Sequence, residues 1–232
     1  YYRIAMLYLK TFIGIIFQVT LFGLFLLLPA PNWYWPDAFI WLVFYFLLNL
    51  ITSFCICAYY PESMEARLES NFKNQPKNDR MATAIIIIGI ALALNMIAVD
   101  VFYLNIFETP KEGSHLLGLA IFTLGYVIIL FSMIQNEFAQ SVVNIQDERD
   151  QVLVDTGLYS FIRHPMYTGF MFFISGMALW LGSLFMATLG TLILMSAFIP
   201  RMIIEEQTLA SELEGYEDYL KRVKYRLLPK IF

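Results

Sequence analysis

Five long stretches of the sequence contain no charged residue: 11–36, 38–61, 81–99, 116–136 and 165–200. A helix needs about 20 mostly apolar residues to cross the hydrocarbon core of a membrane, so the first four stretches fit one crossing each. The fifth is too long for one crossing and has a natural break at Gly182-Ser183. We interpret it as a hairpin of two short helices, 165–180 and 183–199, which gives six transmembrane helices.

The composition excludes a soluble all-α core. Hydrophobic residues make up 59% of the chain and charged residues 15%, whereas a soluble domain carries about 25% charged residues. The run 84–94 is apolar on every side of a helix, so it offers no polar face to water. The sequence therefore predicts an all-α, polytopic membrane helix bundle. Its first four helices are expected near 4–28, 38–60, 81–104 and 116–134.

The basic residues predict the orientation of the bundle. With six crossings, one side of the membrane receives every Lys and Arg except Lys111. Because basic residues concentrate on the cytoplasmic side, both termini and the connections 61–80 and 135–164 are expected there. A bacterial inner membrane is favoured over an endoplasmic reticulum. The net charge of −4 gives no support to nucleic-acid binding.

Polar residues gather late in the chain and predict two functional parts. Residues 1–134 are expected to hold four transmembrane helices that face lipid and shape a substrate entrance. Residues 135–232 are expected to form a cofactor-binding catalytic region with the helical hairpin and a cytoplasmic tail. The tail, 202–224, has apolar residues near helical spacing and a break at Gly215. It is predicted to be an amphipathic helix on the membrane surface.

The densest candidate site is the segment 157–169. Pro165 fits the first position of a helix, where its missing N–H costs nothing, and His164 would cap that helix. Free N–H groups at the helix start could then hold a carboxylate or another anion. A purely structural interpretation, with His164 as an interfacial cap and Arg163 obeying the charge rule, is equally open.

A second candidate site lies where the hairpin ends. Arg201 and Glu205 are four residues apart and can pair on one helix face. A structural salt bridge is an equally open interpretation. Since a hairpin brings its two ends together, a titratable pocket is expected at its cytoplasmic mouth. The two histidines, and Cys55 and Cys57 two positions apart, give no metal-binding cluster, and no metal is predicted.

Several motifs then occur in order along the last hundred residues. They are the runs 143–149, 157–159, 163–169, 201–206, 215–219 and 228–229, including Arg-His-Pro-Met-Tyr and a downstream Glu-Glu. This part of the chain resembles the isoprenylcysteine carboxyl methyltransferase family, within the wider group that includes phospholipid N-methyltransferases. The first 115 residues resemble that family only in being transmembrane.

The resemblance implies an enzyme that uses S-adenosyl-L-methionine in a cytoplasmic-facing pocket closed by the tail. The family's cofactor contacts fall on Gln146, Gln151, Val152, Leu153, Val154, Tyr159, His164, Pro165, Met166, Tyr167 and Glu205. Its substrate-side arginine falls on Arg201, which would steer a carboxylate acceptor. Glu206 is the candidate base if the acceptor is an amine that must first lose a proton.

The acceptor is expected to be lipophilic or lipid-modified, in contact with membrane lipid. It could be a prenylcysteine-like carboxylate, a phospholipid amine or a small thiol, and the sequence assigns no oligomeric state. The alternative activity is that of an NADPH-dependent membrane reductase of the sterol-reductase type. It ranks second because the segment 135–164 offers only Arg149 and Arg163 for the extra phosphate of NADPH.

Overall fold

The computed structural model describes residues 2–68, 77–108, 113–139, 146 and 149–231. Every regular element in these ranges is helical, as the sequence predicts. The long helices are α1 (Tyr2–Leu27), α2 (Pro36–Tyr59), α4 (Lys77–Val99), α5 (Ser114–Gln135), α6 (Pro165–Trp180) and α7 (Thr191–Glu212). The short ones are η1 (Pro31–Trp33), α3 (Pro61–Leu68), η3 (Asp100–Leu104), η5 (Gly157–Ser160), η6 (Met186–Gly190) and α8 (Tyr216–Arg222).

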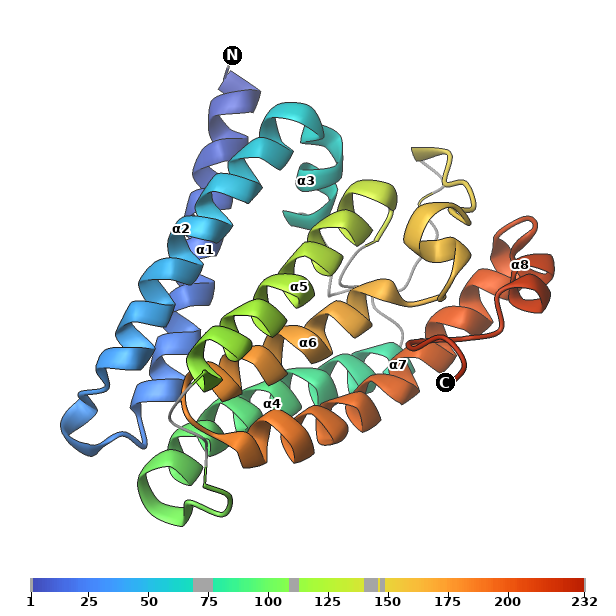
Figure 1. Cartoon of the computed structure of the whole chain (residues 1–232). Coiled ribbons are helices and arrows are strands. Elements are labelled where there is room, and N and C mark those ends of the chain that lie inside the picture. Colours follow the sequence, from blue (N-terminus) through green and yellow to red (C-terminus); the bar gives the residue numbers. More distant parts are fainter. Residues whose placement is uncertain (1, 69–76, 109–112, 140–145, 147–148, 232) are drawn as a thin grey trace.

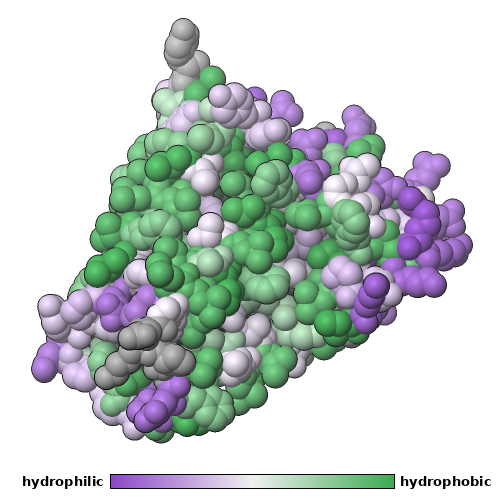
Figure 2. Space-filling model, in the orientation of Figure 1, coloured by the Kyte–Doolittle hydropathy of each residue, from purple (hydrophilic) through white to green (hydrophobic). Residues whose placement is uncertain are grey.

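The helices form a bundle whose two ends differ in character. Within the described residues, five helices are long and apolar enough to cross a membrane. The sixth crossing expected from the sequence is α6, an apolar helix of 16 residues, shorter than a standard span. Figure 1 shows the N-terminus, α3 and α8 at one end of the bundle. Figure 2 shows a broad apolar band across the visible face, with hydrophilic residues at its extremities.

Four glycines let α5 and α6 pack backbone to backbone. A Cβ at Gly125 would lie 2.3 Å from the Phe173 nitrogen, and one at Gly176 would lie 2.1 Å from the Phe122 nitrogen. Gly118 and Gly169 make similarly close approaches to the opposite helix. Membrane helices associate through such small residues because lipid gives no hydrophobic drive between them. The helix pair next to the expected site is therefore the most tightly packed in the bundle.

The predicted hairpin is present, but its second arm is longer than expected. The expected helix end at Ile199 is wrong, since α7 continues through Pro200 to Glu212. Residues 202–212 of the predicted surface tail therefore belong to α7 and do not form a separate helix. A proline is tolerated inside a membrane helix because neighbouring helices support it, and α7 packs along α4. The predicted break is confirmed at Gly215, which has φ +79° and precedes α8.

Two polar side chains tie neighbouring elements together, one at each end of the bundle. Arg67 of α3 donates to the Met133, Asn136 and Ala139 carbonyls at the C-terminal end of α5. Burial lowers the pKa of Arg67 to about 10. At the other end, Asp100 is 1% exposed and accepts hydrogen bonds from Ser183 Oγ and the Ile106 N–H. Asp100 therefore ties η3 to the turn of the hairpin.

Candidate active site

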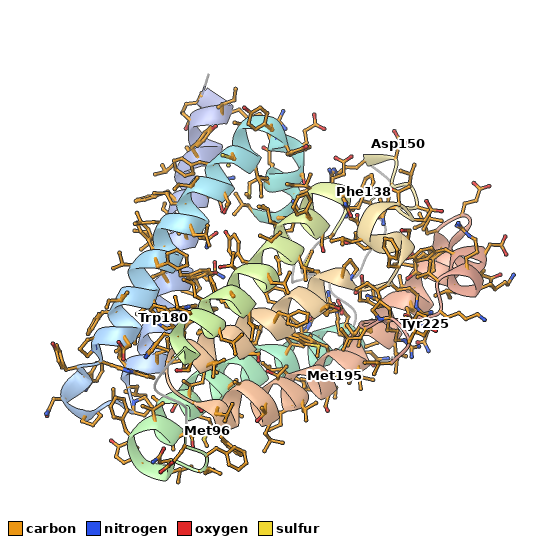
Figure 3. The ribbon with its side chains drawn as sticks, viewed as in Figure 1. Met96, Phe138, Asp150, Trp180, Met195 and Tyr225 are labelled. Carbon is orange, nitrogen blue, oxygen red and sulfur yellow. The ribbon has the colours of Figure 1, made fainter. Side chains whose placement is uncertain are left out.

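The start of α6 has the predicted cap and proline, and the C-terminal segment lies against it. His164 occupies the cap position and Pro165 the first turn of the helix. The backbone N–H groups of Arg163 and His164 donate to the Tyr225 and Arg226 carbonyls, both at 2.9 Å. Figure 3 shows Tyr225 close to this end of the bundle. The C-terminal segment therefore occupies the two N–H groups just before the first helical residue, and the expectation of free N–H groups within the first turn stays a prediction.

The two ends of the hairpin meet, as predicted. Tyr167 Oη donates to Glu205 Oε2 at 3.1 Å, and His164 Nε2 lies 3.1 Å from Glu206 Oε1. His164 is 4% exposed, whereas the Glu205 side chain keeps 31% of its surface accessible. The pairing of α6 with α7 therefore brings four predicted site residues into one cluster, with Glu205 on its open side. Pro165 is buried and Met166 partly buried in the same turn.

Two arginine side chains and His164 surround Glu206. Arg226 Nη2 donates to Glu206 Oε2 at 2.9 Å. Arg163 Nε lies 3.2 Å from Glu206 Oε1 at an angle that makes an ion pair without a hydrogen bond. The hydrogen bonds that Arg226 donates to Glu206 raise the pKa of Arg226 above its ordinary value. Sequence reasoning missed Arg226, which it counted only as part of the basic cytoplasmic side.

Arg201 has a different partner from the one predicted. Its Nη1 donates to Asp79 Oδ1 at 2.5 Å and to Thr83 Oγ1 at 2.6 Å, both on α4. Asp79 is fully buried and Arg201 is 4% exposed. The expected Arg201–Glu205 pair is therefore replaced, because α4 packs along α7 and brings its own acid to the guanidinium. Arg201 also interacts with Tyr167, which joins this pair to the cluster around Glu205.

Other predicted cofactor residues form a group near the end of α5. The Gln146 side chain is buried and donates to the Phe138 carbonyl at 2.6 Å. The Gln151 side chain accepts a hydrogen bond of 3.0 Å from the Gln146 N–H. Figure 3 labels Phe138 and the nearby Asp150 at this end of the bundle. Residues 143–145 and 147–148 of the first family motif lie outside the described residues.

Two of the remaining predicted residues, Tyr159 and Leu153, contact α8. Tyr159 is buried, and its carbonyl accepts a hydrogen bond of 2.8 Å from Tyr219 Oη. Burial raises the pKa of the Tyr159 phenol above its ordinary value. Leu153 packs against the buried Tyr216 and Tyr219. Val154 is partly buried, and Val152 is 62% exposed. The structure thus spreads the predicted cofactor residues over three neighbouring groups.

A cavity of about 370 Å³ lies beside the charged cluster, within the membrane-spanning part. Its wall is mostly apolar and is formed by α1, α2, α5, α6 and α7, with Arg67 and Met64 of α3 at one end. Phe198 lines this cavity and also stacks on Tyr167, with 4.8 Å between ring centroids. One aromatic layer therefore separates the apolar cavity from the Tyr167–Glu205 pair.

Comparisons with known proteins point to the same part of the chain. Residues 114–214 match the model of the phospholipid methyltransferase family. The Protein-S-isoprenylcysteine O-methyltransferase of Schizosaccharomyces pombe is 29% identical over 135 residues, which cover 57% of this chain and 56% of that protein. The chain thus spans just over half the length of this curated relative. The resemblance predicted from the motifs is confirmed: residues 114–214 match the phospholipid methyltransferase family model, and the chain is similar to an isoprenylcysteine methyltransferase.

Proposed function

We propose that this protein transfers a methyl group from S-adenosyl-L-methionine to a lipophilic acceptor at the cytoplasmic face of a membrane. The observation that carries the proposal is the position of the charged cluster. His164, Tyr167 and Glu205 lie on one side of Phe198, and the membrane-embedded cavity lies on the other. A water-soluble donor and an apolar acceptor could approach such a site from opposite directions.

The residues present suit the proposed cofactor. Glu205 is the partly accessible carboxylate of the cluster, and only its Oε2 accepts a hydrogen bond within the described residues. Its Oε1 can therefore accept from an ammonium group such as the amino end of S-adenosyl-L-methionine. When bound, that group supplies a methyl already activated by the sulfonium charge. The protein then has to position the two reactants and exclude water, which can supply much of the rate.

The surroundings of Glu206 favour a carboxylate acceptor over an amine. An amine must lose a proton before it attacks, and Glu206 is the candidate base. Both Glu206 oxygens already accept hydrogen bonds, from His164 or Arg226, and Arg163 adds a second guanidinium beside the carboxylate. We propose that Glu206 holds the start of α6 against the C-terminal segment. A carboxylate acceptor needs no base, and Arg201 remains the proposed group that steers it.

Ligand-induced stabilisation of the detergent-purified protein tests this function. We expect S-adenosylhomocysteine to raise the melting temperature saturably, because binding to the folded state alone stabilises it. Glu205→Gln should abolish this shift, and NADPH should give none. Glu212→Gln provides the matched control, since Glu212 is an exposed acid at the end of the same helix. A shift with NADPH alone would instead support the reductase, and an unchanged shift in Glu205→Gln would remove the proposed cofactor contact.

A further inference from the structure

The membrane-embedded cavity carries a group of hydrogen-bonding side chains on its otherwise apolar wall. Gln18 of α1, Tyr45 and Asn49 of α2, and Tyr126 of α5 all line it. Gln18, Asn49 and Tyr126 are partly accessible inside the cavity. Each lies well inside its helix, many residues from either end. Gln18, Tyr45 and Asn49 precede residues 114–214 and so lie outside the family match.

The hydrogen bonds in this group run in one direction. Ser53 Oγ donates to Asn49 Oδ1 at 3.0 Å. Asn49 Nδ2 in turn donates to Gln18 Oε1 at 3.1 Å and lies 3.5 Å from Tyr45 Oη. The chain of donors ends at the Gln18 amide nitrogen. Within the described residues, neither that N–H₂ group nor the Tyr45 hydroxyl proton has an acceptor.

Within the described residues, no hydrogen bond runs from Gln18 or Tyr45 to the neighbouring hydroxyls of Thr52 and Tyr126. Thr52 Oγ1 donates to the Leu48 carbonyl, so the 2.5 Å contact between Thr52 and Tyr126 uses the Tyr126 proton. Bonds of this kind between helices are common in membrane proteins and explain the contacts of α2 with α1 and α5. They do not explain two donors that remain at the cavity wall. Inside a membrane an unmet donor is costly, since no lipid chain can accept its hydrogen.

We propose that this cavity binds a long-chain lipid with an acceptor oxygen, such as a ketone, part-way along its apolar chain. Gln18 and Tyr45 would donate to that oxygen, and the apolar wall would hold the chain on either side. The cavity volume lies in the usual range for small-molecule sites, about 300–1,000 Å³. The inference rests on the proposed function only in identifying this lipid as the methyl acceptor. Its binding is separable from methyl transfer.

A matched series of lipids tests the inference by binding alone. The probes are methyl octadecanoate and its oxo derivatives with the ketone at successive positions, titrated by calorimetry into the detergent-purified protein. One oxo isomer should bind about fivefold more tightly than the plain ester, the size expected of one net hydrogen bond. Equal binding of every isomer and the plain ester would overturn the inference and would indicate that water satisfies the two donors.

Two variants of the wall locate the effect. Tyr45→Phe removes one oxygen and keeps the ring, and Gln18→Leu removes the amide. Each should reduce the preference for that oxo isomer over the plain ester, because one of the two donors is lost. Thr20→Val is the control, since Thr20 is an exposed residue of α1 outside the cavity. A preference that survives both variants would contradict the assigned donors. Stabilisation by S-adenosylhomocysteine should persist in all three variants. If S-adenosylhomocysteine fails to stabilise the unmodified protein, that result counts against the proposed function and leaves the lipid-binding inference standing.

Discussion

The Arg201–Asp79 pair is the residue-level feature that most changes the expected chemistry of the site. A guanidinium held by a fully buried carboxylate forms a nearly neutral unit. Removing one partner of such a pair leaves an uncompensated charge in an apolar environment, which costs more than the intact pair contributes. Arg201→Ala would therefore test folding as much as acceptor binding, and Asp79 has to be varied with it.

We expect Asp79→Asn to destabilise the folded protein strongly. Losing one partner of a buried ion pair typically costs about 3–5 kcal/mol. Asp79→Asn combined with Arg201→Met should recover a large part of that loss, because both charges then leave together. Thermal unfolding in detergent measures the effect, and Asp218→Asn provides a control in an exposed pair with Lys221. A double variant as unstable as the sum of the two single variants would contradict the coupling.

Part of this site could be predicted from the sequence. His164 and Tyr167 follow from a helix start, and Glu205 follows from the hairpin that returns to the same face. The partner of Arg201 does not follow from any local rule, because Asp79 lies 122 positions away on another helix. The available signal was Asp79, an acid two positions before the uncharged run 81–99. This signal can be interpreted only once α4 is known to pack along α7.

At the scale of elements, the packing of α5 on α6 decides where the cluster stands. Gly118 and Gly125 are seven residues apart, as are Gly169 and Gly176, so each pair lies on one helix face. This spacing was present in the sequence and was the signal that sequence reasoning overlooked. The pairing crosses the predicted division at 134/135, which stays a prediction. The continuation of α7 through Pro200 could not be predicted locally, since a proline alone favours a helix end.

Gly125→Val should separate α5 from α6 and lower both stability and cofactor binding. An added Cβ would lie 2.3 Å from the Phe173 nitrogen, and the opposing backbone cannot move aside as a flexible side chain could. Overpacking of this kind typically costs about 1–3 kcal/mol, occasionally more. Melting temperature and the shift with S-adenosylhomocysteine report the two effects.

Gly89→Ala is the matched control for that substitution. Gly89 is also inside a membrane helix, but its added Cβ would make an ordinary contact of 3.5 Å with Leu194. It should therefore leave both measurements close to those of the unmodified protein. Equal tolerance of the two substitutions would show that the α5–α6 contact does not depend on its glycines.

At the scale of the whole molecule, the fold places the two termini and α3 at the end that also holds the charged cluster (Figure 1). The distribution of Lys and Arg predicts that this end faces the cytoplasm. The helix packing gathers these elements at one end, and the charge distribution predicts which side of the membrane that end faces. A methyl donor that enters from the cytoplasm requires that this end of the bundle face the cytoplasm.

Single cysteines can measure the orientation directly in a variant with Cys55→Ala and Cys57→Ala. Trp33→Cys, in the exposed turn between α1 and α2, should react with a membrane-impermeant maleimide added to intact cells. Ser160→Cys, exposed near the charged cluster, should react only after the membrane is permeabilised. The reverse labelling pattern would place His164 and Glu205 on the outer face. It would contradict both the charge rule and a cytoplasmic methyl donor, while leaving the lipid-binding cavity unaffected because the cavity lies within the membrane.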